Sequence, residues 1–204
     1  MGDAAQLPGP SCLRWVQKFG PALSEEIRRY RTPVSTTWLV DEYVKVLGNW
    51  HYLYRGVDED GQVLDCWLSR TRDLAAAEAF FRSAINSTGC MPEHIVTDKA
   101  TFYPSAIRTY APAARHTATG FYNLVISTNR CERNHGYVKS RVRPMRGLKS
   151  FKCATRLFPS LDALQLVERD FVRVPPIGAP CTGGRSYVRA RHIAAVITRL
   201  GQTL

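Results

Sequence analysis

The sequence predicts an α/β fold, in which one mixed sheet carries helices on its faces. Two observations support this class. Three segments between residues 38 and 69 are rich in Val, Leu, Tyr and Trp, and turn residues separate them, which is typical of antiparallel strands. An amphipathic segment and a short apolar run follow, which indicates that helices and strands alternate thereafter. The hydrophobic share of 45% and the aromatic share of 10% are typical of a globular protein, so global disorder is excluded.

The size and termini of the chain limit its class further. A chain of 204 residues is long enough for one good core, so we expect one main domain with appendages. Its apolar runs all fall short of the roughly 18 residues of a membrane span. The first ten residues, "MGDAAQLPGP", lack the basic and apolar regions of a secretory signal. We therefore expect a cytoplasmic protein with reduced cysteines and no membrane partner.

The N-terminal part predicts two short helical pieces. Ser11–Phe19 has an apolar side, and Gly20-Pro21 is expected to end it. The segment "SEEIRRYRTP" is a second piece, which is expected to end before Pro33. Residues 1–34 are therefore assigned to a short helical region before the main domain.

The three strands of a meander come next. "TWLVDEYVKVLG", "NWHYLYRGVDED" and "GQVLDCWLS" are expected to pair in sequence order, with turns at Gly48-Asn49 and Asp60-Gly61. Within the first strand, Trp38 and Val40 share one face, and Leu39 and Asp41 share the other.

The rest of the main domain alternates helix and strand. The segment "RDLAAAEAFFRSAIN" predicts a helix with Leu74, Ala77, Phe81 and Ile85 on one face. "EHIVTD" is a buried strand, "ATFYPSAIRTYAP" a helix or turn, and "ARHTAT" an edge strand. Helix resumes near Asn129, breaks around Arg143-Pro144 and returns from Lys149, with a kink or split at Pro159. The order β-β-β-α-β-α-β-α is the topology of a ribonuclease H-like fold, which we assign to residues 35–172.

The segment that follows has a different composition. Residues 173–186 hold three prolines and three glycines, which predicts a linker. "YVRARHIAAVITRL" then predicts a C-terminal helix, so residues 173–204 form a separate tail.

The positive charge is concentrated in one stretch. The net charge is +11, and between Thr128 and Arg156 nine basic residues accompany one acid, Glu132. Such a patch favours a polyanion, with nucleic acid as the first candidate; a solvated surface or a membrane surface is the alternative. The predicted DNA-binding residues within it are Arg130, Arg133, Lys139, Arg141, Arg143, Arg146 and Lys149.

Three carboxylates are candidates for a metal site. Asp41 lies in the first strand, Asp98 ends the strand "HIVTD", and Glu132 lies on a later helix. The two strands are neighbours in the predicted topology, so Asp41 and Asp98 are expected to converge at one end of the sheet. Three such oxygen ligands suit Mg²⁺ or Mn²⁺, and two ions can serve a phosphoryl transfer. Taken alone, each residue also fits a purely structural role. Asp41 fits a strand residue paired with a lysine, Asp98 a cap, and Glu132 a surface charge on a helix.

Three blocks of the sequence resemble a known family. "WLVDEYVKVLGNWHYLYRGVDEDGQVLDCWLSRTRD", "TDKATFYPSAI" and "TNRCERNHGYVKSRVRPMRGLKSFKCATR" are similar to the DDE transposases of bacterial insertion sequences, specifically the insertion-sequence-six family. The blocks occur in the family's order and cover roughly Leu13 to Phe171. The resemblance implies a D-D-E site of Asp41, Asp98 and Glu132, with two divalent ions as cofactors. It also implies a homodimer or larger assembly, a nucleoid-associated location, and a contact between Lys139 and the DNA end.

The sequence departs from the family pattern in two places that bear on function. Most of the N-terminal helix-turn-helix is absent, which indicates an N-terminal truncation, and Asn134 replaces the usual Asp. We expect a transposase that cleaves and transfers DNA strands. The alternatives are an inactive remnant that binds DNA or associates with a full-length transposase, and a ribonuclease H-like nuclease or junction resolvase.

Overall fold

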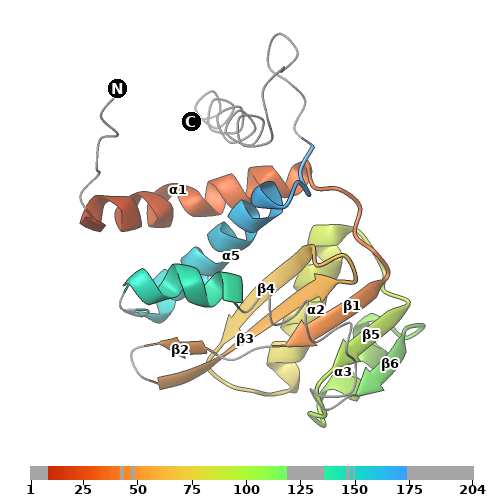
Figure 1. The fold of residues 1–204 in the computed structure, drawn as a ribbon. Helices are drawn as coiled ribbons and strands as arrows, with labels where there is room; N and C mark the ends of the chain where they lie inside the picture. Colours follow the sequence, from red (N-terminus) through yellow and green to blue (C-terminus); the bar gives the residue numbers. More distant parts are fainter. Residues whose placement is uncertain are drawn as a thin grey trace.

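The computed structural model describes residues 9–41, 44–46, 49–118, 136–145, 148 and 150–173, with side chains from Lys18 onward except at residues 41, 44, 45 and 144. Within these ranges the molecule is a mixed sheet between two helical layers (Figure 1). The predicted linker and tail, residues 174–204, lie outside the described residues.

The sheet has six strands, which are β1 (Thr37–Asp41), β2 (Val44–Val46), β3 (Asn49–Asp58), β4 (Val63–Ser69), β5 (His94–Thr97) and β6 (Arg115–Ala118). The segment predicted as the first strand of a three-stranded meander contributes both β1 and β2. β3 pairs antiparallel with β1, β2 and β4, while β5 pairs parallel with both β1 and β6. The turn at Asp60-Gly61 is present, and Gly61 takes the left-handed φ of 81° that glycine tolerates.

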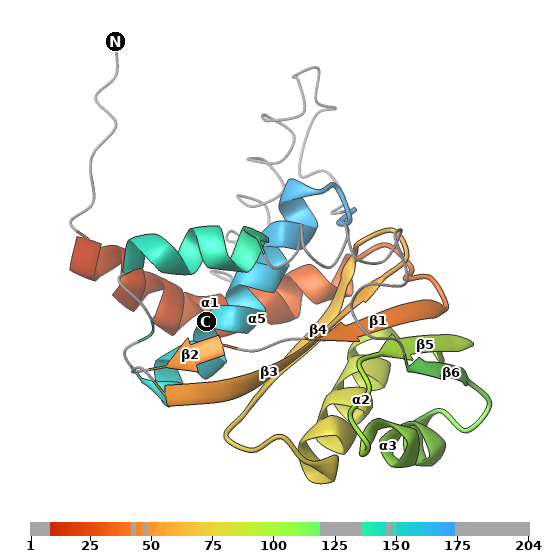
Figure 2. The ribbon, with the colours of Figure 1, turned by 60° about the horizontal axis from the view of Figure 1, so that its bottom comes forward.

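Helices cover both faces of the sheet. α2 (Leu74–Thr88) and α3 (Tyr103–Tyr110) lie on one face, and α1 (Gly9–Arg29) and α5 (Phe151–Glu168) cross on the other (Figure 2). The alternation along β1 follows this division. Trp38 and Val40 pack into the cluster with α2 and α3, while Leu39 packs into the cluster with α1 and α5. Within the described ranges, none of the helices has the length and apolar character needed to cross a membrane.

The N-terminal helix is longer than the sequence predicts. The two expected pieces form one helix, α1, which runs through Pro21. Proline removes one helical hydrogen bond, but packing compensates, because Leu23 and Ile27 are buried against Ala163 and Leu166 of α5. The expectation that Gly20-Pro21 ends the helix was therefore wrong.

The other corrections concern the two helices α2 and α5. Leu74 was predicted on the buried face of α2, but it is 39% exposed, because it begins the helix while the buried stripe runs through Ala77, Phe80 and Ala84. Pro159 does not split α5, which continues through it.

Pro159 and Pro21 both line a cavity of about 590 Å³ between α5 and α1.

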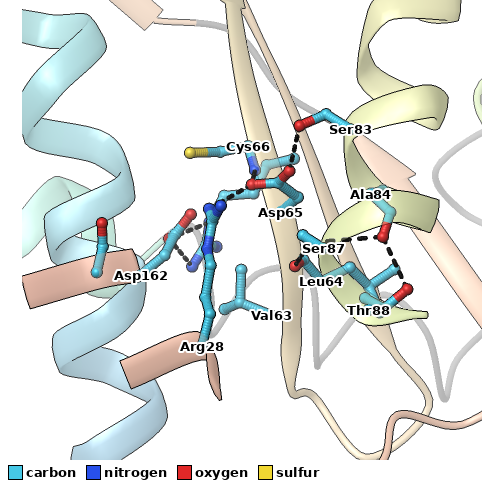
Figure 3. A network of polar contacts seen from close by, with 12 residues as sticks. Arg28, Val63, Leu64, Asp65, Cys66, Ser83, Ala84, Ser87, Thr88 and Asp162 are labelled. Carbon is cyan, nitrogen blue, oxygen red and sulfur yellow. Dashed lines mark hydrogen bonds and ion pairs between the residues drawn. The ribbon is translucent and has the colours of Figure 1, made fainter. Parts of the chain in front are cut away.

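A buried polar network joins α1, β4 and α2 (Figure 3). The Asp65 carboxylate accepts hydrogen bonds from Arg28, from the Ser83 hydroxyl at 2.5 Å and from the backbone N–H of Cys66 at 2.9 Å. Arg31 donates to the carbonyl oxygens of Val63 and Leu64. The Arg31 side chain therefore covers two carbonyl groups of β4, whose only strand partner in the described residues is β3.

A second buried pair connects the sheet to α5. Arg55 of β3 donates through Nε to Asp162 at 2.9 Å and through Nη2 to Gln165 at 2.5 Å. Arg55 and Asp162 are both almost completely buried. Because a buried charge is costly unless it is paired and hydrogen-bonded, these contacts fix the position of α5 over β3.

Candidate active site

The first two candidate carboxylate residues stand at neighbouring backbone positions. Asp41 is the last residue of β1, and Asp98 directly follows β5. The parallel register pairs Thr37 with His94 and Leu39 with Val96. If this register is continued by two residues, Asp41 comes level with Asp98. Both residues therefore lie where two adjacent parallel strands end, the edge of a sheet at which α/β proteins bind ligands.

The backbone around Asp98 is held by several polar contacts. Asp98 Oδ1 accepts a hydrogen bond from the N–H of Ala100 at 2.9 Å, which forms a tight turn after β5. The buried Thr97 hydroxyl donates to the carbonyl of Asp98 at 2.8 Å and also lies 2.9 Å from His116 Nε2 of β6. These contacts fix the direction in which the chain leaves the sheet, so the Asp98 carboxylate is held in place.

Arg72 lies against this carboxylate and was not predicted. Its Nη2 forms an ion pair with Asp98 Oδ2, and its guanidinium lies over the Phe102 ring, 5.6 Å from the ring centroid. The Arg72 side chain is 30% exposed and that of Asp98 is 20% exposed. No sequence signal distinguished Arg72 from Arg70, because the ion pair depends on the approach of two segments in the fold.

Neighbouring residues hold the segment that carries Arg72. Asp73 caps α2, because its Oδ1 accepts from the N–H of Ala76 at 2.9 Å. The Tyr54 hydroxyl lies 3.5 Å from the Asp73 carbonyl, and burial raises the pKa of Tyr54 to about 12. Arg72 is thus attached to the rigid start of a helix.

The third carboxylate and part of the basic run lie outside the described residues. These are Glu132 and the predicted DNA-binding residues Arg130, Arg133, Arg146 and Lys149. Residues 136–142 are helical, and Val138 is buried in a cluster with Leu157 and Phe158 of α5.

The other three predicted DNA-binding residues are exposed. Lys139 and Arg143 are exposed, and so is Arg141, whose side chain is 46% exposed. Arg141 differs from the other two, because it pairs with Glu168 at 2.8 Å and lies over the Tyr137 ring at 4.9 Å. Burial raises the pKa of that tyrosine. Arg141 is therefore partly engaged in holding residues 136–142 to α5.

Comparison with known proteins identifies the family. A family model described as a DDE domain matches residues 35–170, which is most of the chain. The chain belongs to the DDE transposase family of bacterial insertion sequences. The resemblance in the three sequence blocks is thereby confirmed.

Two curated relatives are transposases from Staphylococcus aureus. The transposase for insertion sequence element IS257 in transposon Tn4003 is 30% identical over 146 residues, which cover 69% of this chain and 62% of the relative. The transposase for insertion sequence-like element IS431mec is 32% identical over 134 residues, 63% of this chain and 57% of the relative. This DDE chain thus spans about three fifths of the length of the relatives it matches.

The fold of the DDE domain also has a solved counterpart. A chain of the simian T-cell lymphotropic virus intasome, solved in complex with PP2A regulatory subunit B56 gamma, superposes with a TM-score of 0.52 at 20% identity. The match covers 75% of this chain and 61% of that one. The predicted ribonuclease H-like fold is confirmed.

The donor atoms at Asp98 fit a divalent cation. Each carboxylate oxygen accepts one hydrogen bond, from Ala100 or Arg72, and an ionised carboxylate oxygen has two lone pairs. Such carboxylate oxygens are the hard ligands that Mg²⁺ and Mn²⁺ prefer, and at Oδ2 an ion would compete with the Arg72 guanidinium. Among the described side chains, which do not include those of Asp41 and Glu132, no three metal-ligating groups cluster.

Proposed function

We propose that this DDE domain cleaves and joins DNA strands at the ends of an insertion sequence, with Asp41, Asp98 and Glu132 as its catalytic carboxylates. The main support is the parallel register of β1 and β5, which brings the first two residues level at the end of the sheet. The family match over residues 35–170 supports the same chemistry.

The proposed reaction needs two properties from the chain, metal binding and DNA binding, and the three carboxylates supply the first. Asp41, Asp98 and Glu132 would hold two Mg²⁺ or Mn²⁺ ions, which when bound activate the attacking oxygen and stabilise the leaving one. A water first attacks the phosphorus at the element's end, and the bond to the 3′ oxygen breaks. The freed 3′-OH then attacks a phosphorus of the target strand, and the bond from that phosphorus to the target's own 3′ oxygen breaks, without a covalent protein intermediate.

The basic run supplies the second property, which is DNA binding. The exposed Lys139 and Arg143 are available to contact phosphates, and Arg130, Arg133, Arg146 and Lys149 extend the basic run in the sequence. Such contacts position DNA without reading its sequence, so binding should be strongly dependent on salt. Because two element ends must be joined, we propose that the protein works as a homodimer or larger assembly on DNA.

Strand cleavage by the full chain tests this function. The substrate is a duplex that carries the inverted repeat flanking the gene, with Mg²⁺ or Mn²⁺ present. Asp41→Asn and Asp98→Asn should each reduce nicking by more than about a hundredfold, because loss of a metal ligand costs more than loss of a residue that only supports one. Asp60→Asn is the matched control, because Asp60 lies exposed in the turn between β3 and β4.

The same assay separates the alternative. If the parent protein shows no metal-dependent cleavage, the enzymatic function is wrong. Retained, salt-sensitive binding to the duplex would then favour a remnant that binds DNA or associates with a longer transposase.

A further inference from the structure

The Asp98 carboxylate has a cationic partner in the described structure, the Arg72 guanidinium. We propose that Arg72 is a built-in counter-ion for Asp98, which a divalent ion must displace, so that Arg72 sets the metal affinity of the site. This inference rests on the proposed role of Asp98 as a metal ligand. Its physical basis is that a guanidinium and a divalent ion repel each other when they share one carboxylate oxygen.

The two oxygens of Asp98 have different partners. Oδ1 is held by the N–H of Ala100, a neutral donor within the turn after β5. Oδ2 carries the Arg72 guanidinium. An ion that binds through Oδ2 therefore meets Arg72 directly, while the contact to Ala100 can persist.

The surroundings make the ion pair stronger than one on the open surface. The two side chains are 30% and 20% exposed, so solvent screens their attraction less than it screens an exposed pair. The neighbouring Asp73 and Ala76 hold the start of α2, which limits the freedom that Arg72 loses when it pairs.

Arg72 also has a second contact that does not depend on Asp98. Its guanidinium lies over the ring of Phe102, which packs against Tyr103 with 4.7 Å between ring centroids. A guanidinium is attracted to the face of an aromatic ring. The Arg72 guanidinium can therefore stay over the Phe102 ring when an ion replaces it at Asp98 Oδ2.

A purely structural role for Arg72 makes the opposite prediction. If Arg72 only braces the turn after β5, its removal loosens Asp98 and weakens metal binding. If Arg72 competes with the ion, its removal strengthens metal binding. The direction of the change thus distinguishes the two roles.

The experiment measures Mn²⁺ binding to the full chain without DNA, by the loss of the free-ion signal in electron paramagnetic resonance. Arg72→Gln should bind Mn²⁺ about threefold to tenfold more tightly than the parent protein, because a partly exposed ion pair no longer opposes the ion. Arg72→Lys keeps the charge but loses the planar fork and stacking, so its affinity should fall between the two. It also serves as the test if Arg72→Gln does not fold.

Arg70→Gln is the matched control. Arg70 lies two residues earlier and contacts the Phe151 ring, 5.0 Å from the centroid, so its removal changes the net charge equally. Its Mn²⁺ affinity should equal that of the parent. Equal tightening in Arg70→Gln and Arg72→Gln would attribute the effect to net charge and overturn the proposal.

Asp98→Asn separates this inference from the proposed function. If Asp98→Asn binds Mn²⁺ as well as the parent, Asp98 is not a ligand and both proposals fail. If Asp98→Asn loses binding while both Arg72 variants bind Mn²⁺ no more tightly than the parent, only the counter-ion role is wrong. If neither the parent nor Arg72→Gln binds Mn²⁺, the counter-ion role is also overturned.

Discussion

Arg28 of α1 and Asp65 of β4 form an ion pair, with 2.5 Å between Nη2 and Oδ1, across the boundary between the N-terminal helix and the sheet. The carboxylate is only 2% exposed, while the arginine side chain is 24% exposed. The pair therefore holds α1 against the sheet, together with the burial of Leu23 and Ile27.

Removal of Arg28 should destabilise the fold. Arg28→Ala leaves the buried Asp65 charge without its cation, so the free energy of unfolding should fall by about 2–3 kcal/mol, somewhat less than for a fully buried pair. Arg29→Ala is the control, because the Arg29 side chain is 66% exposed and pairs with Glu26 on the same helix, and it should cost less than about 0.5 kcal/mol. Urea denaturation measures both, and equal losses would contradict a structural role for the Arg28–Asp65 pair.

Gly56 of β3 should not tolerate a larger side chain. An added Cβ would lie 2.9 Å from Leu64 Cδ1 and 2.9 Å from Phe80 Cζ, both of which are buried. Gly56→Ala should therefore lower the free energy of unfolding by about 1–3 kcal/mol. Gly136→Ala has open space around its Cβ, and within a helix it should be neutral or stabilising by up to about 1 kcal/mol. A denaturation midpoint for Gly56→Ala equal to that of the parent would contradict this prediction, because it would show that the Leu64 and Phe80 side chains can move to accommodate the added methyl group.

Two histidines on neighbouring strands should make stability depend on pH. The pKa of His94 is lowered by burial and by the positive charge of Arg115. The pKa of His116 is lowered by burial and by the charge of His94. The unfolded chain therefore binds protons more readily, so stability is complete above the ordinary pKa of 6.5 and falls as pH decreases below it.

Replacement of both histidines tests this dependence. His94→Gln with His116→Gln should reduce the loss of unfolding free energy between pH 7.5 and pH 5.5, measured by urea denaturation at each pH. Gln can still form hydrogen bonds with Thr117 and Thr97, which lie near the two imidazoles. An unchanged pH dependence in the double variant would assign the effect to other groups.

Three basic residues near α5 should contribute unequally to DNA binding. Lys139→Gln and Arg143→Gln should each weaken DNA binding. The slope of the logarithm of the binding constant against the logarithm of the salt concentration should become less steep by about 0.9 for each phosphate that the variant no longer binds. Arg141→Gln should have a smaller effect, because its guanidinium already pairs with Glu168. Fluorescence anisotropy at several salt concentrations measures this, and a largest effect at Arg141 would contradict the ranking.

The strands were readable in the sequence for physical reasons, and the buried face of α2 was readable in part, because Ala77 and Phe81 are buried as predicted while Leu74 is exposed. Alternation along "TWLVD" places Trp38 and Leu39 on opposite faces, and a half-buried strand shows this pattern locally. α1 was misread because a local rule, that proline ends helices, was outweighed by packing against α5.

The surroundings of the candidate site were less predictable. Asp98 could be placed at a strand end from the sequence alone, because the buried run "HIVT" precedes it. Its partner Arg72 could not be found, because an ion pair between segments 26 residues apart depends on how the strands are ordered. The same limit applies to Arg55 and Asp162, which are 107 residues apart.

The contact between α1 and α5 joins the beginning and the end of the described fold. Leu23 and Ile27 share one hydrophobic cluster with Leu39, Val57 and Val96 of the sheet, and with Ala163 and Leu166 of α5. During synthesis the sheet residues leave the ribosome well before α5. The apolar face of the sheet that α5 covers is therefore exposed for roughly several seconds. We expect the nascent chain to depend on chaperones during this interval.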